Sequence, residues 1–472
     1  MGKDKLSQRG IQGDFQIPPR LHPKIWRKPE RRQPLSPTGL QGLQLPHELL
    51  QSSYPLSAEA EIRRRIGARG PITFAEFMEV ALFWPQGGYY LGPEPLGAAG
   101  DFYTSPLVHP AFGALLAVQM YQFWQLLERP APFTVVELGA GNGLLCRDLL
   151  AAANHLPHPF RRSLRYLCLD RRTTTGVERH APPALGAAPA TRLATAGVPL
   201  RGLRGCVLSN EFLDAFPVHQ ARQDGGRLRE VYITLAGTEL AETLGEPSTP
   251  KLAERLAGLG ITLAEGQTVE INLGLPDWAG AVAGALDAGF VLTVDYGQRA
   301  EDLYSASQRP RGTLTTFYRH TQTDAPLRRV GRQDITAQVD FTSVVHAGRS
   351  VGLEPLGFDS QRQFLSQLGL GHLQRRLTAT PLPPRQSQAN RAGMVDLARP
   401  GGLGDFKALV QGKQVGQPKL WGFEISPEAL PLLETLPVPL LTEHHLDLLA
   451  GRYSQPEATV HLDSRWPEEE TD

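Results

Sequence analysis

The chain of 472 residues is 41% hydrophobic, and its 48 basic residues balance its 48 acidic residues. This length allows two average domains or one elaborated domain, and the neutral charge gives no general attraction to nucleic acid or to a membrane surface. No apolar run approaches the roughly 18 residues that a membrane span needs. The three cysteines stand in or beside apolar runs without paired spacing, which predicts reduced core thiols, no zinc site and a cytosol-like compartment.

The first 53 residues show no apolar periodicity and are rich in proline. Residues 1–32 carry nine lysines or arginines against three acidic residues. We expect no secretory signal, because there is no apolar h-region, and no transit peptide, because acids and prolines come early. The segment is interpreted as a disordered extension or an over-long start, and the alternative is a basic arm that contacts a partner.

Residues 54–132 predict a helical segment ahead of the main core. A helix is expected to begin at Ser57, and Thr73-Phe-Ala-Glu76 has the spacing of a capping box, which predicts the start of a second helix. A long helix is expected from about residue 110 to 127. The loop 100–106 precedes it and is dense in small polar groups.

The stretch 133–150 predicts a strand, a glycine turn and a helix. Residues 134–138 are β-rich without a polar face, which is typical of a buried parallel strand. Gly139, Gly141 and Gly143 follow it, and their missing Cβ atoms let a ligand lie against the backbone, as in a nucleotide-binding βαβ unit. The alternative is a turn that only packs the helix on the sheet.

The acid that precedes this turn indicates the kind of ligand. The dinucleotide fingerprint G-x-G-x-x-G aims a helix N-terminus at a pyrophosphate, which the carboxylate of Glu137 would repel. A carboxylate there suits a cationic ligand with an amino-acid tail, such as S-adenosylmethionine with its sulfonium and ammonium groups. The pattern E-x-G-x-G-x-G is similar to motif I of class I methyltransferases, and an NAD-dependent enzyme is the alternative.

A second acid, Asp170, ends the next expected strand at 164–170. In Rossmann-type sites an acid at this place binds the ribose hydroxyls. Asp170 stands 31 residues after Gly139, which is further than the usual spacing of about 20. The alternative is an aspartate that only caps the following helix.

Three polar residues follow the short buried strand 206–209, namely Asn210, Glu211 and Asp214. Ligands of open α/β sheets bind at this carboxyl edge of the strands. Two acids framed by apolar neighbours form a trap for a cation, and the alternative is a solvated turn. A later core strand ends in Asp295, which is a third candidate for holding a cation.

The remaining chain predicts an insertion and a tail. Residues 222–285 alternate apolar and polar in places, which predicts an inserted subdomain with antiparallel strands. A last core strand is expected at 352–358. Beyond residue 425 the composition shifts to Pro, Glu and Leu, and we expect a docked helix near 440–452. The histidines lack paired spacing with Asp, Glu or Cys, so no metal site is predicted.

Seven strings of residues together resemble the MidA family, which includes the mitochondrial complex I assembly factor. The resemblance spans residues 56–424 in the family's order, and the string S-N-E-x-x-D-A-x-P-V-H is highly specific. The end of the second strand departs from it, since Leu169-Asp170-Arg-Arg172 stands where the family more often has a Glu-x-Ser string. The strings lie at 88–90, 100–106, 137–143, 209–219, 294–297, 311–313 and 334–342.

The resemblance implies an α/β fold, a class I methyltransferase Rossmann-like sheet with an N-terminal helical extension. The implied domains are the extension at 54–132, the core at 133–424 with its antiparallel insertion at about 222–285, and the tail at 425–472. The cofactor is expected to be S-adenosyl-L-methionine. The implied reaction transfers methyl to a protein side chain, which is arginine in the mitochondrial member. The alternatives are a small-molecule acceptor, or an assembly factor that binds the cofactor with little activity.

The site residues follow from the strand ends and the small polar loop. Glu211 and Asp214, with Asn210, are the catalytic candidates, because carboxylates would hold a guanidinium acceptor bidentately. We expect a protein partner, no nucleic acid and no membrane, with a homodimer as an option, in the cytoplasm or alternatively in the mitochondrial matrix. The expected cofactor-binding residues are Thr104, Ser105, Pro106, Glu137, Gly139, Gly141, Asp170 and Asn210.

Overall fold

The computed structural model describes residues 57–92, 103–171, 190–318, 321–424, 426–446 and 448–449. The contacts divide the chain into residues 1–53 and 54–472. The predicted basic extension, and the tail from residue 450 onwards, lie outside the described residues. Within the described ranges, none of the helices is long and apolar enough to cross a membrane.

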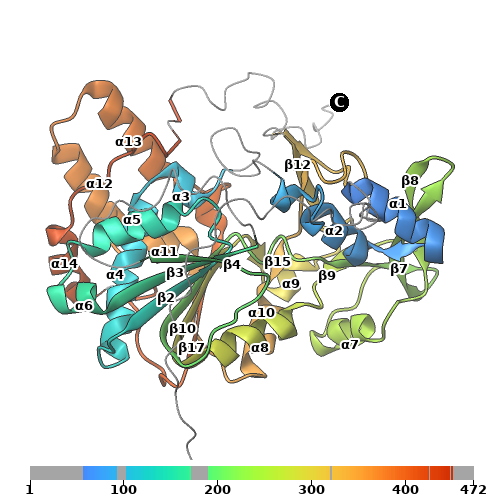
Figure 1. Cartoon of the computed structure of the whole chain (residues 1–472), viewed down its shortest axis with the longest axis horizontal. Helices are drawn as coiled ribbons and strands as arrows, with labels where there is room; N and C mark the ends of the chain where they lie inside the picture. The colour runs from blue at the N-terminus through green and yellow to red at the C-terminus, as the bar shows by residue number, and fades with distance from the viewer. Residues whose placement is uncertain are drawn as a thin grey trace, which may run out of the picture. The chain divides into compact units, whose positions relative to one another are not determined.

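A seven-stranded sheet lies at the centre of the described main core, in the order β16-β17-β10-β5-β2-β3-β4 (Figure 1). The five strands from β10 to β4 are parallel, and β17 is antiparallel to both of its neighbours. This arrangement confirms the predicted α/β class and its Rossmann-like sheet. The strands are β2 (Phe133–Leu138), β3 (Leu164–Asp170), β4 (Ala190–Ala194), β5 (Leu203–Asn210), β10 (Leu286–Asp295), β16 (Glu354–Ser360) and β17 (Lys407–Lys413).

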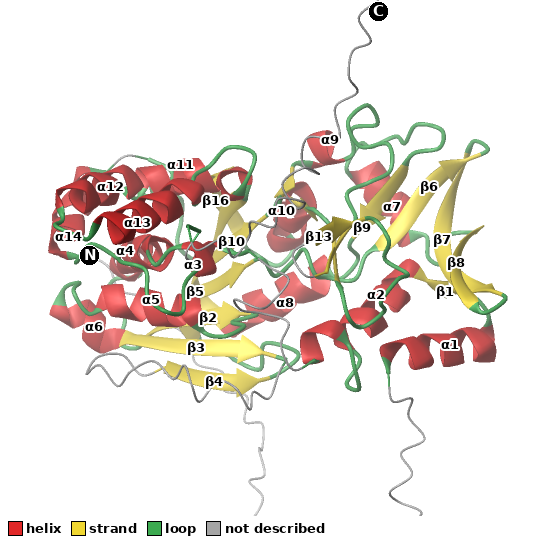
Figure 2. Cartoon of the chain, turned by 90° about the horizontal axis from the view of Figure 1, so that it is seen from above, coloured by secondary structure: helices red, strands yellow, loops and turns green. Residues whose placement is uncertain are grey.

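Helices cover both faces of this sheet (Figures 1 and 2). Successive residues of a strand point to opposite faces, so Val135 of β2 packs with one group of helices and Val136 with the other. Burial on both faces leaves the strand ends as the part of the sheet that can meet a ligand. The first face carries α4 (Ala111–Leu126), α5 (Leu144–Ala153), α11 (Gln361–Gln367), α12 (Leu370–Ala379) and α13 (Pro384–Asp396), and the second carries α8 (Leu275–Ala285) and α10 (Phe341–Arg349).

A second sheet, which is antiparallel, forms mainly from the region predicted as an insertion, and one short strand of the N-terminal segment joins it. Its order is β1-β7-β6-β9, with β8 paired to β7. Its pairing ends at Ile271, and α8 packs instead on the main sheet, because Leu275 and Trp278 join the apolar core there. The division of the chain into domains stays a prediction. The strands are β1 (Ile72–Thr73), β6 (His219–Asp224), β7 (Arg227–Ala236), β8 (Glu239–Gly245) and β9 (Thr268–Ile271).

The N-terminal segment packs on this second sheet. Helices α1 (Ala58–Arg69) and α2 (Phe74–Phe83) share an apolar cluster with Ile233 of β7, and β1 pairs with β7. Thr73 caps α2 by accepting from the Glu76 N–H at 3.1 Å, as the capping box predicts. On the other face, α7 (Lys251–Gly258) packs against β6 and β9. The segment therefore supplies a strand as well as helices.

Short elements join these layers. Those in the described residues are α3 (Ser105–Val108), α6 (His158–Ser163), α9 (Ala300–Leu303), α14 (Leu430–Thr435), β11 (Gly297–Gln298), β12 (Thr315–Tyr318), β13 (Thr321–Thr323), β14 (Asp334–Thr336) and β15 (Val339–Asp340). Strand β12 pairs with both β13 and β14, and β11 pairs with β15.

The tail segment 441–446 forms no helix, which corrects the prediction for 440–452. Its backbone donors are used in tertiary contacts instead, because Leu446 N–H donates to Leu107 O at 2.8 Å. His445 Nε2 pairs with Asp148 Oδ2 of α5 at 2.8 Å, and both side chains are buried. The tail is thus fastened to the helix that follows the glycine turn.

Strand β5 approaches β2 closely at Gly205. A Cβ atom at this glycine would lie 1.8 Å from the carbonyl oxygen of Thr134. The contact falls between two central parallel strands that are buried on both faces, so the neighbouring chain has little room to move.

We therefore expect Gly205→Ala to lower the free energy of unfolding by about 2 kcal/mol or more, through overpacking. Chemical denaturation would measure the change. The control is Gly197→Ala, because a Cβ atom there would meet nothing within 4 Å. The control should stay within about 0.5 kcal/mol of wild type, and equal effects of the two substitutions would contradict the prediction.

Candidate active site

Neighbouring parallel strands bring the predicted residues to one edge. Strand β2 ends at the glycine turn, β3 at Asp170 and β5 at Asn210, and β10 ends at Asp295 on the far side of β5. The carboxyl ends of parallel strands form the edge at which open α/β sheets bind ligands. The candidate site is therefore this edge.

The glycine turn has a left-handed backbone, with φ of +67° at Gly139, +52° at Gly141 and +78° at Gly143. Residues that carry a Cβ atom rarely adopt this left-handed backbone conformation. The Gly141 N–H donates to Asp170 Oδ2 at 2.9 Å. A Cβ atom at Gly139 would lie 2.6 Å from the Phe212 ring. The turn thus needs glycine for its conformation, and the structure brings Gly141 together with Asp170 despite their long sequence spacing.

Asp170 takes part in a small polar cluster at the end of β3. Besides the Gly141 N–H, it faces Arg192 of β4, whose NH2 lies 3.8 Å from Oδ2 and donates to Gly141 O. The Asp170 side chain is 13% exposed. The carboxylate is held at the turn and still reaches solvent, which is compatible with a ribose ligand. That role stays a prediction.

Glu137 lies at the end of β2 with an enclosed side chain. Its Oε2 accepts from the Tyr166 hydroxyl at 2.9 Å and lies 3.9 Å from Cys168 Sγ. Burial raises the pKa of Glu137 to about 8, although the hydrogen bond from Tyr166 lowers it. The carboxyl is therefore mainly protonated at neutral pH in the protein alone. A role of Glu137 in binding the cofactor stays a prediction.

Asn210 and Glu211 adjoin the loop that carries Thr104, Ser105 and Pro106. The Asn210 Nδ2 donates to Glu211 Oε1 at 2.9 Å, and the Ser105 N–H approaches the same oxygen at 3.4 Å. Thr104 is the N-cap residue of α3, and Pro106 lies in its first turn. The structure therefore brings together two predicted groups that are about a hundred residues apart.

Two features of this strand end are costly for the protein alone. Glu211 has a φ of +50°, a strained conformation for a residue with a side chain. Asn210 Oδ1 is buried and has no hydrogen-bond partner within the described part of the chain. Strain and unpartnered buried acceptors gather where a ligand satisfies them, so both features support this edge as a binding site.

Asp295 shapes the turn between Glu211 and Asp214. Its Oδ2 accepts from the N–H groups of Phe212 at 3.0 Å and Leu213 at 2.9 Å. Its Oδ1 accepts from its neighbour's N–H, that of Tyr296, at 2.9 Å. Both oxygens are therefore engaged with the backbone. The sequence offered Asp295 as a third holder of a cation, and the structure shows it holding the turn.

Burial raises the pKa of the three acids at this edge, and the charge of Asp214 adds to the shift of the other two. The pKa of Glu211 rises to about 8, first through burial and then through the charge of Asp214. Burial raises the pKa of Asp214 to about 6, against a hydrogen bond with Tyr296 that lowers it. Burial also places the pKa of Asp295 well above its usual range, and Asp214 adds to this. A cation among these acids would favour their ionised forms.

Two tyrosines, Tyr90 and Tyr296, lie near Asp214, although their positions in the sequence predicted no role for them. Burial raises the pKa of Tyr90 well above its usual range, and the nearby charges of Asp334 and Asp214 add to this. Tyr296 shows the same shift, from burial and then from Asp214. Both tyrosines stand in strings noted for the family resemblance, at 88–90 and 294–297, and this was the signal available in the sequence.

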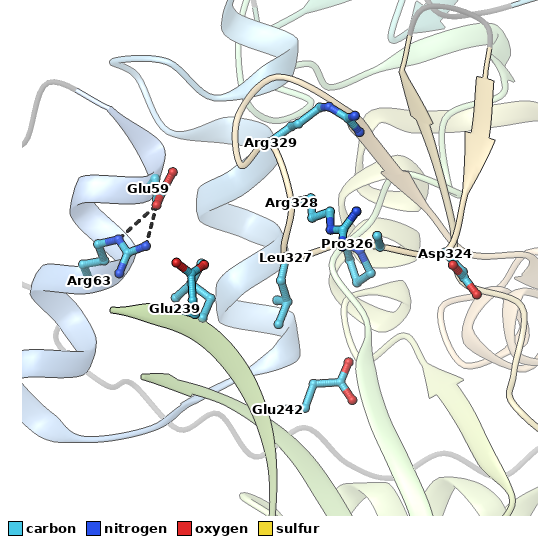
Figure 3. Close-up of a pocket in the computed structure, with 11 residues that line it drawn as sticks. Glu59, Arg63, Glu239, Glu242, Asp324, Pro326, Leu327, Arg328 and Arg329 are labelled. Carbon is cyan, nitrogen blue, oxygen red and sulfur yellow. Dashed lines mark hydrogen bonds and ion pairs between the residues drawn. The ribbon is translucent and has the colours of Figure 1, made fainter. Parts of the chain in front are cut away.

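An open groove of about 620 Å³ lies away from this edge, between α1, β8 and the segment 324–329 (Figure 3). Figure 3 shows acidic and basic side chains along it, with Arg63 paired to Glu59. No predicted site residue lines the groove. Among the described residues, no group of three or more His, Cys, Asp or Glu side chains is arranged to hold a metal ion.

Comparison with known proteins identifies similar sequences and folds. Residues 115–359 match the profile of a family described as S-adenosyl-L-methionine-dependent methyltransferases. The chain is 29% identical over 416 residues to a Drosophila melanogaster protein named "Protein arginine methyltransferase NDUFAF7 homolog, mitochondrial", with 81% of this chain and 92% of that protein covered. The human protein named "Protein arginine methyltransferase NDUFAF7, mitochondrial" is 27% identical, with 65% of this chain and 72% of that protein covered.

A solved structure shares the fold over most of the chain. It is a COG1565 superfamily member from Burkholderia thailandensis, bound to S-adenosyl-homocysteine. Its TM-score is 0.68 at 26% sequence identity, and the match covers 78% of this chain and 94% of that chain.

The raised pKa of Glu211 predicts how stability changes with pH. Between its ordinary value of 4.5 and its folded value of about 8, the unfolded chain has lost this proton and the folded protein keeps it. The folded state binds more protons in this window, so the free energy of unfolding falls as pH rises. We expect Glu211 to contribute a fall on the order of 2 kcal/mol between pH 5 and pH 8.

Chemical denaturation of wild type and Glu211→Gln at both pH values measures this contribution. The variant should show a smaller loss of stability between the two pH values, because its amide does not ionise. Glu239→Gln, at an exposed acid of β8, should keep the wild-type dependence. The same slope in wild type and in Glu211→Gln would contradict the raised pKa.

Proposed function

The chain belongs to the MidA family of S-adenosyl-L-methionine-dependent methyltransferases, and we propose that it methylates a guanidinium nitrogen of arginine in a protein. The observation that carries this proposal is the pair of acids Glu211 and Asp214 beside the glycine turn, at the carboxyl edge of the sheet. The names of the relatives, which are protein arginine methyltransferases, support a protein acceptor.

The residues at the edge fit the cofactor. When bound, S-adenosyl-L-methionine supplies a methyl group on a positively charged sulfur. The backbone of Gly139 and Gly141 would lie against it, and the Asp170 carboxylate would take its ribose hydroxyls. The unpartnered Asn210 Oδ1 would accept a hydrogen bond from it. Thr104, Ser105, Pro106 and Glu137 complete the proposed cofactor site.

The acids would hold the acceptor. Glu211 Oε1 accepts from Asn210, so Oε2 is the oxygen that would accept from a guanidinium N–H. Asp214, which is 5% exposed, would accept a hydrogen bond from a second N–H of the same planar group. Such fixed orientation of the two reactants lowers the barrier by on the order of 7–11 kcal/mol. A carboxylate with a pKa near 8, as in Glu211, is also suited to receive the proton that the methylated nitrogen loses.

The names of the relatives also bear on the location of the protein. The Drosophila and human relatives are named mitochondrial, and this supports the matrix alternative over the cytoplasm that the cysteines and the lack of a signal predicted. Methylation of a small molecule and an assembly role with little activity remain outcomes of the test below. A homodimer stays a prediction.

We expect Gly141→Val to weaken binding of S-adenosyl-homocysteine by at least about tenfold. Gly141 has a φ of +52°, which a β-branched residue adopts only with strain, and the turn would rearrange. Isothermal titration calorimetry measures the affinity. The control is Gly260→Val, because Gly260 has a φ of +70° at the end of α7 and therefore carries a similar strain elsewhere. Unchanged affinity in Gly141→Val would remove the turn from the cofactor site.

Transfer of label from methyl-tritiated S-adenosyl-L-methionine into a cell lysate tests the acceptor class. We expect a labelled protein band on a gel, whereas label confined to small molecules, or no label, would contradict a protein acceptor. In Glu211→Gln the labelling rate should fall by about 100-fold or more, because the amide cannot accept the proton. The same variant should bind S-adenosyl-homocysteine like wild type. Normal labelling by the variant would exclude Glu211 from catalysis.

A further inference from the structure

Glu270 of β9 is a buried acid of the antiparallel sheet and is 7% exposed. It is not one of the predicted site residues. Its Oε2 accepts from both the N–H of Thr313 at 2.7 Å and the Thr313 hydroxyl at 3.0 Å. Its Oε1 accepts a hydrogen bond from Gln220 Nε2 at 3.4 Å. One carboxylate of the second sheet thus accepts from both hydrogen-bond donors of Thr313, which lies in the segment between α9 and β12.

The turn at 311–313 is shaped around this carboxylate. Gly312 has a φ of +77°, and a Cβ atom there would lie 2.3 Å from Glu270 Oε1. The next residue, Thr313, can then present its N–H and its hydroxyl to the same oxygen. Because the carboxylate is buried, water cannot replace these hydrogen bonds at low cost.

The Thr313 hydroxyl connects Glu270 to the segment 336–339. It donates to Glu270 and also accepts from the Gln338 N–H at 3.1 Å. The preceding residue, Ala337, donates its N–H to the carbonyl oxygen of Asp214 at 3.0 Å. A continuous series of hydrogen bonds and one peptide link therefore joins Glu270 to the main chain of Asp214.

The same segment meets the candidate site at a second point. The Val339 N–H donates to Tyr296 O at 3.0 Å, and β15, which begins at Val339, pairs with β11 directly after Tyr296. Tyr296 in turn hydrogen-bonds Asp214. A shift of the segment would consequently move Asp214 through its backbone and through its neighbour.

We propose that Glu270 is a positioning residue for methyl transfer: through Thr313 it fixes the segment 336–339 and thereby the place of Asp214. The antiparallel sheet then sets the geometry of the acceptor site through the backbone of this segment. The inference rests on the proposed function, because it takes Asp214 as a holder of the acceptor.

Substitutions at both ends of the Glu270–Thr313 contact test the proposal. Glu270→Gln keeps the size of the side chain and removes its charge, and Thr313→Val keeps the shape and removes the hydroxyl. Each should lower the rate of protein labelling from tritiated S-adenosyl-L-methionine about tenfold, with the affinity for S-adenosyl-homocysteine within twofold of wild type. Thr313→Ser retains the hydroxyl and should restore the rate.

The matched control is Glu265→Gln in the loop before β9. Glu265 also accepts two backbone N–H groups, those of Gly225 and Gly226, but it lies in an exposed turn of the same sheet. This variant should label protein at the wild-type rate. A loss equal to that of Glu270→Gln would mean that any damage to the sheet lowers activity, and it would overturn the specific role of Glu270.

Hydrogen–deuterium exchange gives a measurement that needs no acceptor. Peptides that contain residues 336–339 should exchange faster in Glu270→Gln and Thr313→Val, and at the wild-type rate in Thr313→Ser and Glu265→Gln. Unchanged exchange in the first two variants would overturn the proposal, as would faster exchange with unchanged labelling. Wild-type protein that labels no acceptor would instead contradict the proposed function, so the two failures are distinguishable.

Discussion

The site depends on the way one buried carboxylate, Asp295, binds the backbone beside it. By accepting from Phe212 and Leu213 it fixes the turn whose two ends are Glu211 and Asp214. The turn would otherwise leave two N–H groups without partners inside the protein, at a cost of about 1–3 kcal/mol each. Because Asp295 ends β10 and the turn begins at the end of β5, the pairing of these two parallel strands already places the acids.

The electrostatics of the edge follow from this geometry. Burial raises the pKa of all three acids, and the charge of Asp214 adds to the shift of Glu211 and of Asp295. In the protein alone, the raised pKa keeps Glu211 and Asp295 protonated well above the ordinary range of a carboxyl, since burial and a nearby like charge disfavour the ionised form. A bound cation removes this restriction. The acids that could attract a cation at this edge are therefore buried and do not form an exposed negative surface.

Local sequence predicted the parts of the site that lie at strand ends. Parallel strands end at one edge of the sheet, so residues that follow different strands lie close together there. This rule was enough to predict the glycine turn, Asp170 and the pair Asn210 and Glu211 as one group. The role of Asp295 could not be found in this way, because it depends on donors about 82 residues away. The same limit applies to Glu270 and Thr313, and to β1, a two-residue strand that only its pairing with β7 defines. Similarly, a docked helix was expected near 440–452 in the leucine-rich tail, but contacts with α3 and α5 hold residues 441–446 in another conformation.

The fastening of the tail to α5 sets an order of events during synthesis. His445 is made 297 residues after Asp148, its partner on the helix behind the glycine turn. At a translation rate of about 5–20 residues per second, the ribosome takes roughly 15–60 s to cover this interval. Throughout that time Asp148 lacks His445 as a partner, and the apolar surface that Leu446 later covers beside Leu107 and Leu144 stays uncovered. Strands β2 to β10 of the main sheet are therefore synthesised well before the tail segment that packs on α5, whereas β17 ends only at Lys413, shortly before that segment.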